Sequence, residues 1–160
     1  MLGMLGRRRP RSRNFAAAPS LEDRLRGLAA FAPIFESEGY EFGHWRPQQT
    51  RDDGAIVLPY FVQGRDADDF VHACYALGWI MPGFDWGAWK GTAEARALVA
   101  SPAALAKATT EALARMLTTL IRQDRFVEGS LARAFERGLL TAIARRAAVL
   151  VSETPGLDGE

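Results

Sequence analysis

The C-terminal half of the chain contains two apolar helical segments. They are joined by the stretch Leu120-Ile121-Arg122-Gln123-Asp124-Arg125-Phe126-Val127-Glu128-Gly129-Ser130. Before it, Ser101-Pro102 is typical of a helix start, with an N-cap serine and a first-turn proline. Apolar residues recur at three- and four-residue spacing in both segments, which indicates one core-facing stripe on each. The first stripe is Leu105, Ala108, Leu113, Met116, Leu117 and Leu120, and the second is Leu131, Phe135, Leu139, Ile143, Ala147 and Leu150. We therefore predict a C-terminal helical hairpin with the quoted stretch at its corner, and Gly138 either weakens the second helix or divides it.

Asp124, at this corner, is a charged residue that the helical pattern would place on the core-facing side. If the helix over residues 102–121 continues, its apolar stripe leads directly to Asp124, because steps of three and four stay on one face. A buried carboxylate must be paired or neutralised, and the nearby candidates are Arg122, Arg125 and Arg133. The main hypothesis is an ion pair that locks the last two helices together. The alternative is a polar cleft at this junction, lined by Asp124, Arg125 and Glu128.

Two further helices are expected in the N-terminal half. Ser20 is a candidate N-cap for the first, which Pro33 should break or kink near Ala32 and Gly39 should end. Asp66 is a candidate N-cap for the second, and Gly78 is a natural residue to end it.

Between these helices, residues 40–45 and 56–62 are rich in aromatic and β-branched residues, which favours strands. The polar connection between them ends in Asp53-Gly54, so we predict a hairpin. Pro59 cannot donate to a strand ladder and should lie at an edge or a bulge. The predicted fold class is α+β: a mostly helical single domain with a small two- or three-stranded antiparallel sheet and a C-terminal helical hairpin.

The composition limits the domain organisation and the compartment. With 160 residues, 48% of them hydrophobic, the chain can bury one core. We expect a disordered basic leader over residues 1–19, one globular domain over residues 20–152 and an acidic tail over residues 153–160. No apolar run approaches the roughly 18 residues that a membrane span needs. The single cysteine, Cys74, excludes an intramolecular disulfide, which favours a cytoplasmic protein.

Nucleic-acid contact could arise only through the leader, which carries five arginines and no acidic residue. A folded nucleic-acid binder usually has a basic stripe on its domain, and the sequence shows none. Nucleic acid is therefore an unlikely partner except through Arg7, Arg8, Arg9, Arg11 and Arg13.

Five short motifs occur in a fixed order along the chain. They are Tyr40-x-Phe42-Gly43-x-Trp45, Leu58-Pro59-Tyr60, Gly78-Trp79-Ile80, Phe84-Asp85-Trp86-x-x-Trp89 and Ile121-Arg122-x-Asp124-Arg125-Phe126-x-x-Gly129. As a set they resemble a bacterial family of short proteins described as a domain of unknown function. The resemblance covers roughly residues 22–150. It implies a fold and supplies no catalytic residues to transfer.

Residues 81–91 form an aromatic segment that we expect to be a loop, because it contains proline and three glycines. Trp86 and Trp89 beside Asp85 could hold a cationic or planar ligand by stacking. More often such a cluster covers a small core, with each indole N–H bonded to a partner.

A catalytic or metal site has weaker support. His44 could act with Asp85 or Glu128 as an acid–base pair, and a small enzyme using Asp85, Asp124, Glu128 and His44 is the alternative hypothesis. The two histidines and one cysteine show no zinc-ligand spacing. No phosphate-binding glycine motif or nucleophile elbow is present, so we predict no metal and no cofactor.

Our leading interpretation is a small cytoplasmic binding or interaction module for an unknown protein or small ligand. Its recognisable sequence features, such as helix caps and apolar stripes, favour packing, and none of them forms a recognisable catalytic motif. The candidate ligand- or partner-binding residues are Asp85, Trp86, Trp89, Arg122, Asp124, Arg125 and Glu128.

Overall fold

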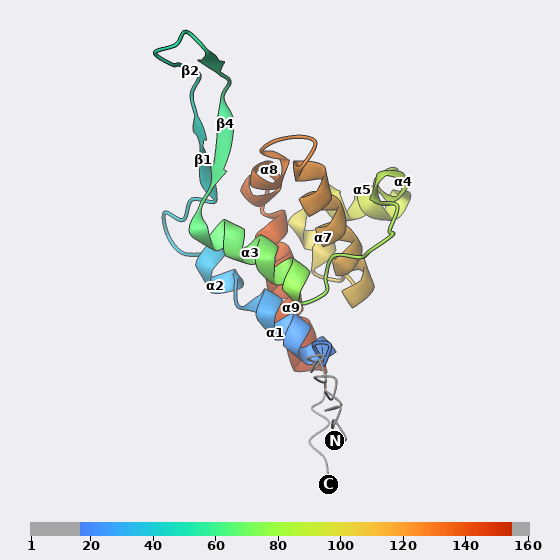
Figure 1. Cartoon of the computed structure of the whole chain (residues 1–160). Coiled ribbons are helices and arrows are strands. Elements are labelled where there is room, and N and C mark those ends of the chain that lie inside the picture. The colour runs from blue at the N-terminus through green and yellow to red at the C-terminus, as the bar shows by residue number, and fades with distance from the viewer. Residues whose placement is uncertain (1–16, 155–160) are drawn as a thin grey trace, which may run out of the picture.

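A computed structural model describes residues 17–154 and confirms the α+β class (Figure 1). Its helices surround one core, and a long β-hairpin projects from them. In chain order the elements are α1 (Leu21–Ala29), α2 (Ala32–Phe35), β1 (Gly43–Arg46), β2 (Gln49–Thr50), β3 (Ile56–Val57), β4 (Tyr60–Gln63), α3 (Arg65–Ala76), α4 (Trp86–Lys90), α5 (Ala93–Ala100), α6 (Pro102–Leu105), α7 (Thr110–Asp124), α8 (Ser130–Glu136) and α9 (Leu139–Glu153).

The first helix begins as predicted, but it ends at Ala29, a few residues before the predicted break near Ala32. Ser20 and Asp23 form a reciprocal capping box at the start of α1, which satisfies backbone N–H groups that have no partner within the helix. The helix stops after Ala29 and resumes as α2, with Pro33 in its first turn. Gly39 then ends this segment in a left-handed conformation, at φ +73°.

The hairpin consists of two short antiparallel pairs. β1 pairs with β4, from Gly43 opposite Gln63 to Arg46 opposite Tyr60, and β2 pairs with β3 nearer the tip. Pro59 lies in the gap between β3 and β4, where its missing N–H costs no ladder bond. The strands are shorter than predicted, since residues 40–42 lie outside β1.

The start of α3 differs from the prediction, and its end agrees with it. The N-cap is Gly64, so Asp66 lies in the first turn instead of capping the helix. At the other end, the N–H of Gly78 donates to Tyr75 O and that of Trp79 to Cys74 O. This pair of bonds is a Schellman motif. It turns the chain so that Trp79 is fully buried.

The region between α3 and α7 contains more helix than the sequence predicted. The aromatic segment forms α4, and α5 follows it unpredicted. The expected helix over residues 102–121 is two helices, α6 and α7, because Thr109 caps a new start by accepting from the N–H of Ala112. Alanine favours helix throughout this stretch, so helix propensity does not mark where the breaks occur.

The C-terminal helices complete the core. Gly138, at φ +79°, divides the predicted last helix into α8 and α9. α7 packs mainly on α8, whereas α9 makes its most extensive contact with α1. Within residues 17–154, no helix combines the length and the apolar character that crossing a membrane requires.

Two predictions lie outside the described residues. Residues 1–16, which include Arg7, Arg8, Arg9, Arg11 and Arg13, hold nearly all of the predicted basic leader, and with it the nucleic-acid prediction. Residues 155–160 hold most of the predicted acidic tail.

Candidate functional site

Asp124, the last residue of α7, provides the cap for α8. The N-cap position of α8 is Gly129, which has no side chain to accept the first N–H groups. Instead, Asp124 Oδ1 accepts from the N–H of Leu131 at 2.9 Å and lies 3.4 Å from the Ser130 hydroxyl. Asp124 Oδ2 lies 3.4 Å from the Gln63 amide nitrogen. The carboxylate thus stabilises the start of the next helix from outside it.

The predicted ion pair between Asp124 and an arginine is therefore wrong. Among the described residues, no ion pair joins Asp124 to Arg122, Arg125 or Arg133. Backbone, hydroxyl and amide donors already surround the half-buried carboxylate, so it needs no guanidinium. Arg125 turns away and donates to the Tyr75 hydroxyl at 2.7 Å.

Glu128 joins the same corner to the hairpin. Its Oε1 accepts from the backbone N–H of Phe61 in β4 at 2.8 Å. The Trp45 ring lies against Gly129, where an added Cβ would come within 2.5 Å of Trp45 Cζ2. Trp45 and Phe61 in turn pack edge to face at 5.5 Å. Glu128 and Asp124 thus contact the hairpin, and a polar cleft at this junction stays a prediction.

Asp85, Trp86 and Trp89 of the aromatic segment have different structural roles. Asp85 caps α4 by accepting from the N–H of Ala88 at 2.9 Å. Trp86 stacks on Phe126 of the corner, with ring centroids 6.0 Å apart and Phe126 77% exposed. Trp89 is only 8% exposed and belongs to the core. Ligand or partner binding by these residues stays a prediction.

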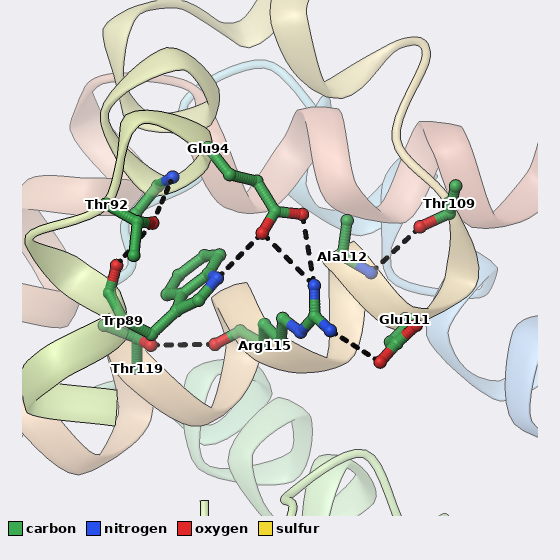
Figure 2. A network of polar contacts seen from close by, with 9 residues as sticks. Trp89, Thr92, Glu94, Thr109, Glu111, Ala112, Arg115 and Thr119 are labelled. Atoms are coloured by element: carbon green, nitrogen blue, oxygen red, sulfur yellow. Dashed lines mark hydrogen bonds and ion pairs between the residues drawn. The ribbon is translucent and has the colours of Figure 1, made fainter. Parts of the chain in front are cut away.

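A polar network fixes Trp89 and joins α5 to α7 (Figure 2). The Trp89 indole N–H donates to Glu94 at 2.9 Å, and Glu94 forms an ion pair with Arg115 at 3.2 Å. Arg115 also pairs with Glu111 at 2.6 Å. Because Thr92 caps α5 beside Trp89, one set of contacts holds α4, α5 and α7 at a fixed separation.

That separation leaves a cavity of about 480 Å³, which we call the α5–α7–α8 groove. Its lining falls into three chemical groups. The apolar wall includes Trp89, Val99, Met116, Leu120, Ala134 and Leu139, the neutral polar residues are Thr119, Gln123 and Ser130, and the cations are Lys90, Arg96, Arg133 and Arg137.

The residues proposed for an acid–base site do not converge in this groove. Asp85, Asp124 and Glu128 each accept a backbone N–H, and His44 is exposed on β1. Of the predicted site residues, Trp89 alone lines the groove. A second cavity, between α6 and α9, is likewise lined by no carboxylate or histidine.

Sequence reasoning missed the groove because it did not predict α5, which supplies one wall. One signal was present: Arg133 and Arg137 are four residues apart, a spacing that places them on one helical face. From the sequence, Arg133 is predicted only as a possible ion-pair partner for Asp124, and no role is predicted for Arg137.

Comparison with known families gives one match. The model of a family of unknown function, DUF6508, matches residues 20–153. The chain belongs to this family. The DUF6508 match confirms the predicted resemblance over nearly the expected range. No curated protein matches the chain, and no solved structure does. DUF6508 is described as a family of unknown function, so the family supplies no activity for the groove.

Proposed function

We propose that the chain is a small-molecule binding module and that its site is the α5–α7–α8 groove. The observation that carries this proposal is the volume of about 480 Å³ beside a largely apolar wall built from separate helices. Ligand sites are typically cavities of roughly 300–1,000 Å³ with apolar walls and a few polar groups.

The rigidity of the walls supports a preformed site. Trp89 is held by its bond to Glu94, and the Thr119 hydroxyl donates to Arg115 O within α7 at 2.8 Å. Met116 is fully buried, so the floor of the groove is continuous with the core. A ligand that enters would therefore find most of its contacts in place, which lowers the ordering cost of binding.

A small enzyme has less support. An acid–base site needs titratable groups within reach of one bound substrate. The carboxylates proposed for that role are engaged with backbone N–H groups at helix starts and at the hairpin. The groove instead offers binding surface without a carboxylate or histidine in its lining.

The test uses N-phenyl-1-naphthylamine, an uncharged probe that fluoresces in apolar sites. Ala100, at the end of α5, is exposed and lines the groove, so Ala100→Trp should fill the groove without overpacking the core. Ala97→Trp, on the same helix and outside the lining, is the matched control. We expect Ala100→Trp to abolish probe binding and Ala97→Trp to retain it. Equal binding by both variants would overturn the proposal.

A further inference from the structure

The charges along the α5–α7–α8 groove all have one sign. Lys90, Arg96, Arg133 and Arg137 line it, and no acidic residue does. Like charges that share a concave, partly apolar surface raise the local potential and attract an opposite charge. The charge pattern is therefore a second feature of the groove, separate from its volume and apolar wall.

These cations differ from the protein's paired arginines. Among residues 17–154, five ion pairs join arginines to glutamates, and none involves a groove cation. Arg137 donates to the carbonyl oxygen of Val99 at 2.7 Å. No hydrogen bond in the described part of the chain uses the side chains of Lys90, Arg96 or Arg133. The paired arginines are Arg26, Arg115, Arg145 and Arg146.

The cations come from different helices that line the groove. Arg96 belongs to α5, whereas Arg133 belongs to α8. Leu120 and Met116 of α7 line the same groove. A guanidinium presents a planar fork of N–H donors that matches a carboxylate or a phosphate. An anionic group could therefore be held between α5 and α8 while an apolar body lies on α7.

We infer that the ligand of the groove is a small anion with an apolar body, bearing a carboxylate or a phosphate. This inference rests on the proposed function, because it assigns a chemical class to the ligand of the same site. Arg96 and Arg133 are the residues that select the charge, and the α7 wall accepts the body.

Two probes with one aromatic body separate the inference from the proposed function. The first, 8-anilinonaphthalene-1-sulfonate, carries a sulfonate, and N-phenyl-1-naphthylamine is the same body without it. In the double variant Arg96→Gln/Arg133→Gln, the sulfonate probe should bind about tenfold more weakly, as expected for lost charge-assisted hydrogen bonds. The uncharged probe should change by less than about twofold. The control Arg46→Gln/Arg51→Gln removes the same charge from the exposed hairpin and should leave both affinities unchanged.

The outcomes are distinguishable. If Ala100→Trp fails to reduce binding of the uncharged probe, the proposed function is lost and the inference with it. If the groove binds that probe but the double arginine variant leaves the sulfonate affinity unchanged, the groove is a neutral site and the inference alone is overturned. The same holds if the hairpin control weakens sulfonate binding as much as the double variant does.

Competition identifies the natural anionic group. Octanoate and octyl phosphate, which carry the same kind of apolar chain, should displace the sulfonate probe from the wild-type protein, and the stronger competitor assigns carboxylate or phosphate. Octanol, which has the same apolar chain without the charge, should displace it about tenfold less effectively. Displacement by octanol and octanoate alike would contradict the inference.

Discussion

Gly129 is constrained twice, by its backbone and by a distant side chain. Its φ of +77° lies in the left-handed region that other residues enter at a cost. In addition, a Cβ at this position would come within 2.5 Å of the Trp45 ring. The sequence predicts a turn at Gly129, between two helical segments. It does not predict that Gly129 contacts Trp45 on the hairpin.

The two constraints can be measured separately. Gly83 also has a positive φ, +69°, yet a Cβ there would meet nothing within 4 Å. We expect Gly83→Ala to cost about 1 kcal/mol of unfolding free energy, from the backbone alone. Gly129→Ala should cost about 1 kcal/mol more, because Trp45 must leave its packed position.

Urea unfolding of both variants provides the comparison. The excess cost of Gly129→Ala should disappear in a Trp45→Ala background, since the ring is then absent. Equal effects of the two glycine substitutions in the wild-type background would show that the Trp45 contact contributes nothing.

At the scale of elements, the corner between α7 and α8 is built from one helix capping the next. The αL conformation of Gly129 allows the sharp turn, and the N–H of Ser130 donates to Val127 O, but Gly129 has no side chain to accept the N–H of Leu131. Asp124 supplies that acceptor from the end of α7. The carboxylate of Asp124 thus links the end of α7 to the start of α8, in addition to the packing of the two helices.

Removal of this cap should destabilise the protein. We expect Asp124→Ala to lower the unfolding free energy by about 1–2 kcal/mol, the usual cost of losing a helix cap. Asp124→Asn should lose less, because its amide oxygen can still accept from the N–H of Leu131. Thermal unfolding is the measurement, with Asp69→Ala on the exposed face of α3 as the control. An unchanged melting temperature together with lost probe binding would instead make Asp124 a ligand-binding residue.

At the scale of the whole molecule, contacts between distant segments hold the parts together. Glu128 and Phe61, 67 residues apart, connect the hairpin to the helical body, and α1 lies on α9 near the two ends of the described chain (Figure 1). Inside, Cys74 on α3 is fully buried in the core. This position makes Cys74 an inert core thiol.

Burial raises the pKa of the Cys74 thiol above its ordinary range. Below a pH of about 8.5 the thiol is neutral in both the folded and the unfolded chain, so it contributes no pH dependence. Above that pH the unfolded chain ionises while the folded one stays protonated, and folding stability falls. Between pH 8 and pH 10 we expect wild type to lose about 2 kcal/mol more than Cys74→Ala, at about 1.4 kcal/mol per pH unit.

Urea titrations of both proteins at the two pH values measure this difference. An aromatic disulfide reagent gives an independent check, since Cys74 should react only once the chain is unfolded. Parallel pH profiles for the two proteins, or rapid reaction in the native state, would contradict a sealed core around Cys74.

The sequence by itself determined the α+β class, the β-hairpin and several helix ends, but not the start of α3, the presence of α4 and α5, or the break before α7. Ser20, Gly39, Gly78 and Gly138 act on backbone groups within a few residues, so their effects can be predicted locally. Tertiary structure alone decided the partners of Asp124 and Glu128, the contact of Trp45 with Gly129, and the groove cations. These contacts join segments that are far apart in the sequence and that only packing brings together. In addition, an arginine and a backbone N–H can each donate a hydrogen bond to a carboxylate. Chain composition alone does not distinguish these donors, because the choice depends on which of them the folded core places within reach.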